Sequence, residues 1–173
     1  MKPQTFLSEN WTEWVSMLSI MTCPFCRQQH GKIKSVHQRW LVYPPAHPNC
    51  HCIIEKLQAI EAGNATNRGN DGADWHLAHT GELPDYYIDK HQAQDEGWRR
   101  REGNLSTVLP GMMIGGDIFH NSEGKLPEAP NRIWREADIN YTGGARNSER
   151  ILYSNDGLIF VTYDHYQTFF EIV

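Results

Sequence analysis

The 173-residue sequence has no long hydrophobic run. A helix that crosses a bilayer needs about 20 consecutive apolar residues, and no stretch of this chain approaches that length. The first residues, MKPQTFLSENW, also lack the apolar segment of a secretory signal. We expect a cytosolic protein, a part cut from a larger delivered protein, or an effector that travels without a signal peptide. The last of these would act in the cytoplasm of a target cell.

Cysteine is absent from most of the chain, because all four cysteines lie between Cys23 and Cys52. Positive charge is scarce in residues 71–173, where nine Lys and Arg accompany seventeen Asp and Glu, a net charge of −8. Residues 1–70 carry seven Lys and Arg and four Asp and Glu, a net charge of +3. There are no internal repeats. These asymmetries predict a Cys/His module over residues 1–62, a Gly- and Asn-rich linker over 63–72 and a second domain over 73–173.

The segments on both sides of the cysteines have the apolar spacing of helices. In ENWTEWVSMLSI, residues 9–20, the apolar side chains recur at intervals of three and four. IIEKLQAIEAG, residues 53–63, shows similar spacing and ends in glycine. The spacing predicts a small helical first module.

The second half changes from helical to strand signals along the chain. Residues 71–84 and 89–98 have helical patterns, with Asp89 as a cap, and residues 104–111 allow one short turn. IWREADI alternates, so Ile133, Ala137 and Ile139 are predicted on one face and Glu136 on the other. RILYS and LIFVTY flank an NDG hairpin signal, and QTFFEIV forms a last strand. Helices followed by hairpin-linked strands predict an α+β fold with a twisted antiparallel sheet.

Acidic, basic and cationic side chains lie close to the predicted strands of this second domain. Glu136 faces solvent or a cleft, Arg146 and Arg150 follow a glycine turn, His165 lies between two strands, and Lys90 begins a helix. Such a set fits phosphoryl transfer, in which protons move and negative charge builds on a phosphate. Each residue also has an ordinary reading as a solvated surface group or, for His165 beside an aspartate, a turn cap.

Four long segments narrow this choice: LPDYYIDKHQAQDEGW, GGDIFHNSEGKLP, WREADINYTGGARNSERILYS and TYDHYQTF. From about residue 71 to residue 173 they resemble the barnase-type guanyl-preferring microbial ribonucleases. The resemblance implies the microbial ribonuclease fold. It places the general base on Glu136, the general acid on His165 and the phosphate-binding cations on Lys90, Arg146 and Arg150.

The same resemblance implies cleavage of RNA by its own 2′-hydroxyl, without a catalytic metal. The first product would be a 2′,3′-cyclic phosphate, which water opens to a 3′-phosphate. A carboxylate among three cations stays ionised through neutral pH, as a base must. The resemblance also implies a guanine-recognition loop over residues 119–123, with substrate-binding roles for six residues: Phe119, His120, Asn121, Glu123, Tyr166 and Asp117.

The loop differs from its relatives at some positions. His120 stands where relatives have serine, and Ser122 replaces a basic residue. Ala145 and Gly157 replace aromatic residues. These changes concern loop affinity and inhibitor contacts and leave the proton-transfer pair intact. We also expect Arg132 and Asp156 to form a structural salt bridge.

The motifs CPFC and HPNCHC have the spacing of a zinc site. We predict Cys23, Cys26, Cys50 and Cys52 as ligands of a structural zinc ion, with His47 as a substitute. Two disulfides or four free thiols are the alternatives. Metal binding would supply folding energy to so short a segment.

Residues 22–52 also resemble the end of the Mu F-like phage head-morphogenesis module, which implies contact with a phage head or delivery system. The combined prediction is a guanyl-preferring endoribonuclease toxin, blocked by an acidic barstar-like immunity protein. The alternative is a phage-head structural or interaction protein with an inactive ribonuclease-like domain.

Overall fold

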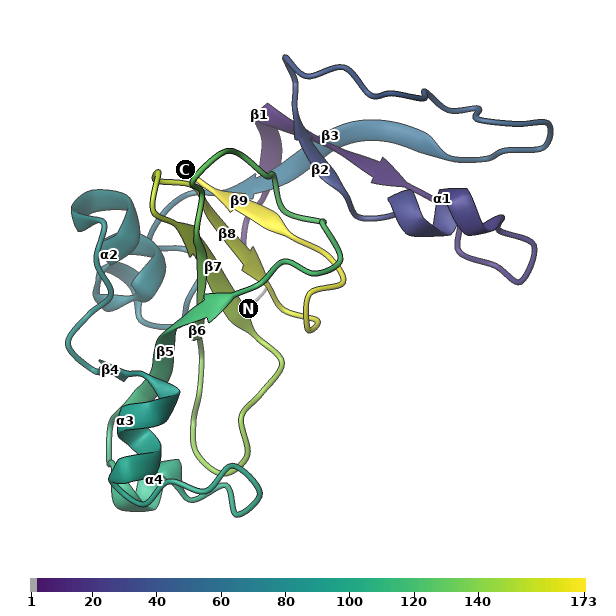
Figure 1. Cartoon of the computed structure of the whole chain (residues 1–173). Coiled ribbons are helices and arrows are strands. Elements are labelled where there is room, and N and C mark those ends of the chain that lie inside the picture. The colour runs from purple at the N-terminus through teal and green to yellow at the C-terminus, as the bar shows by residue number, and fades with distance from the viewer. Residues whose placement is uncertain (1–2) are drawn as a thin grey trace.

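The computed structural model describes residues 3–173, in which nine strands form one sheet in the order β2-β1-β3-β9-β8-β7-β6-β5-β4 (Figure 1). The strands are β1 (Phe6–Val15), β2 (Ile33–Ser35), β3 (Ile53–Ile60), β4 (Tyr87–Ile88), β5 (Met113–Phe119), β6 (Trp134–Asp138), β7 (Arg150–Ser154), β8 (Ile159–Thr162) and β9 (Phe170–Ile172). The helices are α1 (Pro24–Gln29), η1 (Gly69–Asp71), α2 (Ala73–Thr80), α3 (Lys90–Asp95) and α4 (Leu105–Val108). Within residues 3–173, no helix has the length and apolarity needed to span a membrane.

The second half follows the predicted α+β order. Helix α3 begins after Asp89, whose side chain accepts a hydrogen bond from the Gln92 amide at 2.8 Å. Strands β5 to β9 pair antiparallel in sequence order, and residues 155–157 turn β7 into β8. The predicted helices and strands of residues 71–173 are therefore confirmed.

Both faces of this sheet are covered. Ala137, Ile139 and Ile151 pack with Leu77 of α2 on one face. Trp134 packs on the other face with Leu126 of the loop before β6 and with Trp11 and Leu57 of the N-terminal strands. The prediction that Ile133 points inward is wrong, because β6 begins one residue later and Ile133 is 45% exposed.

The two helices predicted in residues 9–20 and 53–63 are wrong, because these segments form β1 and β3. In β1 the buried residues Ser8, Trp11 and Trp14 recur every three residues. The pairing of β1 with β3 shifts between Leu7 and Thr12, and such a bulge moves the side chains that follow it to the other face. Trp11 and Trp14, beyond the bulge, are buried in two different clusters, so a strand covered on both faces shows the spacing of a helix. The only helix in residues 3–62 is the six-residue α1.

The N-terminal strands continue the sheet of residues 71–173 through a parallel pairing of β3 with β9 (Figure 1). Glu171 of β9 is buried and accepts hydrogen bonds from the side chains of Ser8, Asn10 and Trp11. Residues 63–72, predicted as a linker, form turns and η1, and the Asp74 carboxylate accepts hydrogen bonds from two amides of this segment. Extensive packing and buried polar contacts thus connect the N-terminal strands to the rest of the sheet.

Candidate active site

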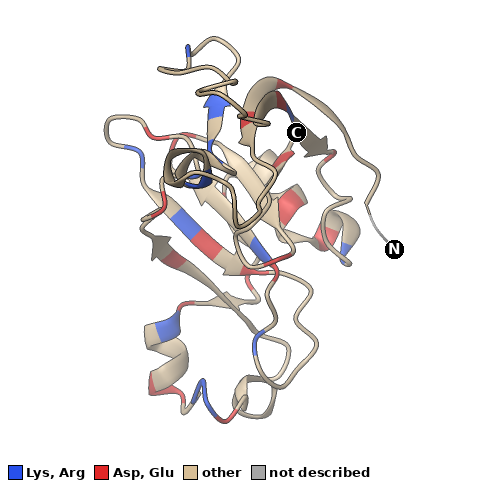
Figure 2. Cartoon of the chain, turned by 90° about the vertical axis from the view of Figure 1, so that its right-hand side faces the viewer, with Lys and Arg blue, Asp and Glu red and all other residues tan. Residues whose placement is uncertain are grey.

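A pocket of about 420 Å³ lies between the sheet and the loop that follows β5. Its walls come from α3, β5, β6, the loop of residues 120–125 and the turn before β9. Predicted site residues line much of it: Lys90, Phe119, His120, Asn121, Glu123, Glu136 and Tyr166. Figure 2 shows acidic and basic residues interspersed over the strands and loops of the whole chain. The charged residues of the pocket are therefore a local group and do not belong to a larger patch of one sign.

Glu136 lies in the pocket with only 9% of its surface exposed. The Lys90 ammonium donates a hydrogen bond to Oε1 at 2.7 Å, and the Tyr166 hydroxyl donates one to Oε2. Burial alone would raise the pKa of Glu136, but the bonds from Lys90 and Tyr166 and the charges of Lys90 and Arg146 outweigh it. The net pKa is below the ordinary value, so the carboxylate is ionised at neutral pH and can accept a proton.

Asp117 pairs with Glu136 across β5 and β6. Its carboxylate lies 3.7 Å from the Lys90 ammonium and accepts a hydrogen bond from the Lys90 amide at 3.3 Å. Asp117 therefore supports Lys90 at the start of α3, and it is outside the set of residues that line the pocket.

Replacing Lys90 with methionine is expected to move the acidic limb of the pH–rate profile to higher pH by about one unit. Burial raises the pKa of Glu136, and the Lys90 ammonium is one of the groups that lower it. Without the ammonium the pKa of the Glu136 carboxyl rises, so Glu136 becomes protonated at higher pH. The measurement is kcat/KM against pH for the phosphoryl-transfer reaction that the sequence predicts. Arg135→Met is the matched control, because it removes an exposed cation from β6, the strand that carries Glu136. An acidic limb that stays in place in Lys90→Met would contradict the assigned electrostatic coupling.

Arg146 and Arg150 converge on one buried carboxylate. Asp138 is fully buried and accepts hydrogen bonds from Arg146 Nε and Nη2 at 2.7 and 2.6 Å. Arg150 Nε lies 3.0 Å from the same carboxylate. Asp138 follows Glu136 by two residues on β6, so it holds both guanidinium groups near the Glu136 carboxylate. The charge of Arg146 acts on Glu136, and those of both arginines act on Tyr166.

His165 lies in a tight turn between β8 and β9. Both His165 and Tyr166 have positive φ, 60° and 67°, which is uncommon for residues other than glycine. The Asp164 carboxylate accepts hydrogen bonds from the amides of Gln167 and Thr168 and holds this turn. His165 is exposed, and its ring lies 4.8 Å from that of Tyr166, whose hydroxyl contacts Glu136. The turn thus carries His165 to the edge of the pocket.

The loop after β5 is closed by Asn121, which has a φ of 47° and a buried side chain. Its amide donates to the Leu126 carbonyl and accepts from the Leu126 amide. Before the loop, the ring of Phe119 stacks on Tyr166 at 5.2 Å. Glu123 remains exposed on the loop, with its carboxylate 3.1 Å from the Lys125 ammonium. The loop therefore has a fixed backbone and a freely accessible carboxylate.

Lys90 and Glu136 are thus in direct contact in the pocket, and Arg146 and Arg150 are joined through Asp138, whereas neither arginine nor His165 is among the residues that line the pocket. Two contributors were missed by sequence reasoning. Asp138 was detectable, because residues two apart on a strand share a face. Lys125, which lines the pocket and donates to the Tyr166 carbonyl at 2.8 Å, lies in an irregular loop with no such signal.

Comparison with known proteins identifies the class of molecule that carries this arrangement. Residues 70–173 match the family model described as ribonuclease. The chain belongs to the ribonuclease family. A ribonuclease of Heyndrickxia coagulans is 54% identical over 102 residues, which cover 59% of this chain and 94% of the relative. Ribonucleases of Bacillus intermedius and Bacillus pumilus are also 54% identical over 102 residues, and the match covers 63% of each. The resemblance to barnase-type ribonucleases is confirmed.

The predicted salt bridge outside the pocket is also present in this ribonuclease. The Arg132 guanidinium donates to the Asp156 carboxylate at 2.7 and 2.9 Å, and its Nη1 donates to the Pro127 carbonyl at 2.8 Å. It ties the segment before β6 to the β7–β8 hairpin.

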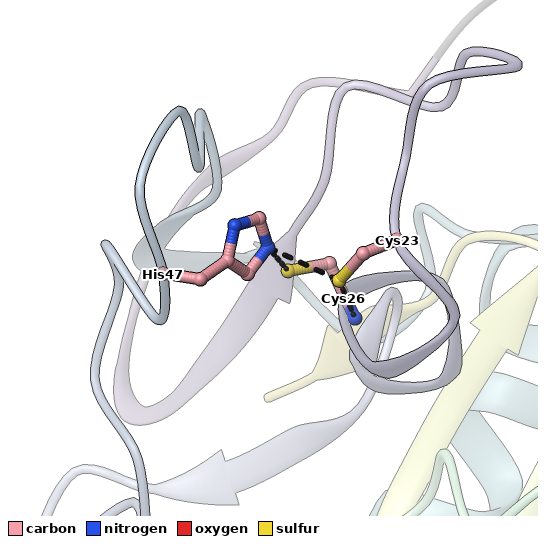
Figure 3. A group of neighbouring side chains, drawn as sticks. All are labelled: Cys23, Cys26 and His47. Atoms are coloured by element: carbon pink, nitrogen blue, oxygen red, sulfur yellow. Dashed lines mark hydrogen bonds between the residues drawn. The ribbon is translucent and has the colours of Figure 1, made fainter.

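The cysteine motifs, which lie outside the family match, gather five potential metal ligands in the N-terminal half of the ribonuclease. His47 Nε2 lies 3.1 Å from Cys23 Sγ and 3.3 Å from Cys26 Sγ (Figure 3). Cys26 Sγ lies 3.7 Å from Cys50 Sγ, and Cys26, Cys50 and Cys52 form a second close group. All four cysteines are free thiols. A hydrogen bond from the Cys52 amide is the main cause that lowers the pKa of Cys50 to about 7, towards the thiolate form that binds metals.

Proposed function

We propose that the chain is an endoribonuclease that cleaves RNA after guanosine without a catalytic metal. The observation that supports it best is the Glu136 carboxylate, ionised in a pocket beside Lys90, Arg146 and Arg150. In this reaction the nucleophile is the 2′-hydroxyl of the substrate, so the protein needs to supply proton transfer and charge stabilisation only.

The first step is transphosphorylation. Glu136 accepts the proton of the 2′-hydroxyl as its oxygen attacks the adjacent phosphorus, and His165 donates a proton to the departing 5′-oxygen. The P–O5′ bond breaks and a 2′,3′-cyclic phosphate forms. In the second step water attacks phosphorus, His165 accepts its proton and Glu136 returns a proton to the 2′-oxygen, which leaves a 3′-phosphate. Three cations stabilise the negative charge that builds on the phosphoryl oxygens.

Guanine preference would come from the loop that ends at Glu123. Guanine presents two adjacent donors, N1–H and the 2-amino group, and one carboxylate accepts both. Loop amides held in place by Asn121 are available for O6. Adenine would leave these polar groups unpaired, which is costly. Phe119 and Tyr166, already stacked, offer an aromatic surface beside the base, while His120 lines the same pocket.

Replacing Glu123 with alanine is expected to lower the preference for guanosine over adenosine by roughly 10- to 100-fold, because a charged hydrogen-bond partner is worth about 1.5–3 kcal/mol. The measurement is kcat/KM for the dinucleotides GpA and ApA. Glu82→Ala, which removes an exposed carboxylate outside the pocket, is the control. An unchanged ratio in Glu123→Ala would remove Glu123 from base recognition and leave the cleavage chemistry untouched.

We propose a second, structural role for the Cys/His cluster as a zinc site. Tetrahedral zinc with Zn–S bonds of about 2.3 Å places its sulfurs about 3.8 Å apart, close to the 3.7 Å between Cys26 and Cys50. A disulfide would need about 2.05 Å. Cys23, Cys26 and His47 form one group of close ligands, and Cys26, Cys50 and Cys52 form the other, so only Cys26 belongs to both. The proposed ligands are Cys23, Cys26 and Cys50, with either His47 or Cys52 as the fourth.

We further propose a toxin role, with delivery to a target cell and control by an acidic immunity protein. The cations around Glu136 favour a partner with acidic groups, because complementary charge speeds association. The toxin role would be supported if the wild-type gene can be cloned only together with the adjacent gene, while the gene of a Glu136 variant can be cloned alone. Contact with a phage head or delivery system through the cysteine segment remains a prediction. The inactive structural protein is not favoured, because the catalytic set is intact.

A further inference from the structure

A second groove, of about 570 Å³, lies on the far side of the loop that forms the wall of the active-site pocket. One of its walls is N-terminal and includes Lys32, Lys34 and Arg39. The other is the loop itself, through Gly124, Leu126 and Glu128. The groove therefore exists only because the N-terminal segment packs against the ribonuclease domain, and residues 1–69 lie outside the family match.

The N-terminal wall is unusually rich in unpaired positive charge. Residues 14–54 contain four Lys and Arg and no Asp or Glu, in a chain whose net charge is −5. Three of these four cations line the groove. Within residues 3–173, no carboxylate lies within 4.0 Å of their charged nitrogens. Lys34 lies 4.9 Å from the centre of the Trp40 ring, which restricts its position without neutralising it.

The opposite wall offers little competing charge. Glu128 is its one acidic residue, and its Oε1 accepts a hydrogen bond from the Asn121 side chain. That bond holds the carboxylate against the loop. The groove therefore presents a cationic surface to a ligand.

The groove and the active-site pocket share one narrow, rigid wall. Glu123 and Lys125 line the pocket, while Gly124 and Leu126 line the groove. The Ile33 amide donates to the Lys125 carbonyl at 2.8 Å, which fixes the start of β2 against this loop. A chain that leaves the pocket across the loop therefore reaches Lys32 and Lys34 next.

We propose that this groove binds the backbone phosphates of the RNA strand beyond the guanosine held in the pocket. The proposal rests on the proposed function and adds a second contact surface to it. Residues 71–173 carry a net charge of −8 and repel a long polyanion. The N-terminal cations offset that repulsion along the path of the RNA. The N-terminal segment therefore favours longer RNA, while the pocket selects the base.

The test compares two triple variants of the full chain. Lys32→Ala/Lys34→Ala/Arg39→Ala removes the groove cations. Arg99→Ala/Arg100→Ala/Arg101→Ala removes three exposed arginines that line neither cavity, with an equal change in net charge. For the groove variant, we expect KM for a 20-nucleotide RNA with one guanosine to rise about tenfold at low salt, while kcat/KM for GpA is unchanged. The slope of log KM against log salt concentration should fall by about 2, because each of the three phosphate contacts to a single strand contributes about 0.7 to that slope.

Binding is measured separately, by fluorescence anisotropy of the same RNA in the catalytically impaired Glu136→Gln background. Weaker binding by the groove variant alone supports the proposal even if wild-type protein cleaves no RNA, so this result is distinct from failure of the proposed function. Equal weakening by both triple variants would reduce the effect to overall charge and overturn the proposal. Loss of GpA cleavage in the groove variant would also overturn the proposal. So would a groove variant that keeps its affinity for RNA and loses its affinity for poly-glutamate. The single variant Arg39→Ala, at an exposed position, should show part of the same RNA effect if the triple variant folds poorly.

Discussion

Replacing Glu136 with glutamine is expected to lower kcat for RNA cleavage by roughly 10²- to 10⁴-fold, the usual contribution of general acid–base catalysis. Glutamine has nearly the same shape and can still accept a hydrogen bond from Lys90. It cannot take a proton from the 2′-hydroxyl at neutral pH. The effect should therefore fall on kcat, with a smaller change in KM. Initial rates on GpA, measured over a range of substrate concentrations, separate the two constants.

The His165→Ala variant should show a loss of similar size, because the leaving 5′-oxygen would then depart without a proton. The double variant Glu136→Gln/His165→Ala should lose less than the product of the two single losses, since groups that act as a unit are not additive. Glu82→Gln serves as the control for loss of one carboxylate. Single variants that cleave as fast as wild type would show that another pair of groups performs the proton transfers.

The second large effect concerns the cysteine cluster. Replacing Cys26 with serine is expected to reduce bound zinc from about one ion per chain to near zero and to unfold the N-terminal strands. Cys26 is common to both groups of close ligands and is 2% exposed. Structural zinc contributes apparent free energies of about 10–16 kcal/mol in small domains, so its loss removes a large stabilising term from the segment, in addition to its packing against the sheet. Elemental analysis measures the metal, and hydrogen exchange of the amides of residues 53–60 measures the folding of β3.

His51→Ala is the matched control, because His51 lies between two of the cysteines, is exposed and belongs to neither group of ligands. It should retain the metal. Comparison of His47→Ala with Cys52→Ser identifies the fourth ligand, since only the variant that lacks a true ligand should lose zinc affinity. Wild-type protein that contains no zinc after expression in zinc-supplemented medium, or that forms two disulfides under the same conditions, would contradict the site.

Sequence reasoning was accurate where local signals agreed with the fold. In residues 71–173, Asp89 caps α3 and the NDG turn joins β7 to β8, as the local patterns predicted. The predicted roles of Glu136 and His165 come from the family resemblance, because the two residues lie 29 positions apart and no local pattern links them. Asp138, which holds Arg146 and Arg150, is not predicted from the sequence, although it lies two residues from Glu136 on the same face of β6.

The N-terminal segment was misread for a physical reason. Trp11 and Trp14 recur at helical spacing, yet they are buried in two different clusters, Trp11 against the sheet core and Trp14 against the cysteine segment, because both faces of β1 are covered. Nothing local in β3 indicates its parallel pairing with β9, a contact between residues more than 100 positions apart. The position of Lys125 likewise depends on tertiary contacts, because Ile33 and Tyr166 hold it from distant segments.

The most direct test of the central claim is the product that forms first from GpA without added divalent cation. Guanosine 2′,3′-cyclic phosphate should appear before guanosine 3′-phosphate when the products are followed by chromatography. Added Mg²⁺ should not raise the initial rate of cleavage. Direct appearance of a 5′-phosphate product, or cleavage that requires a divalent cation, would contradict a mechanism in which Glu136, His165 and three cations perform the chemistry.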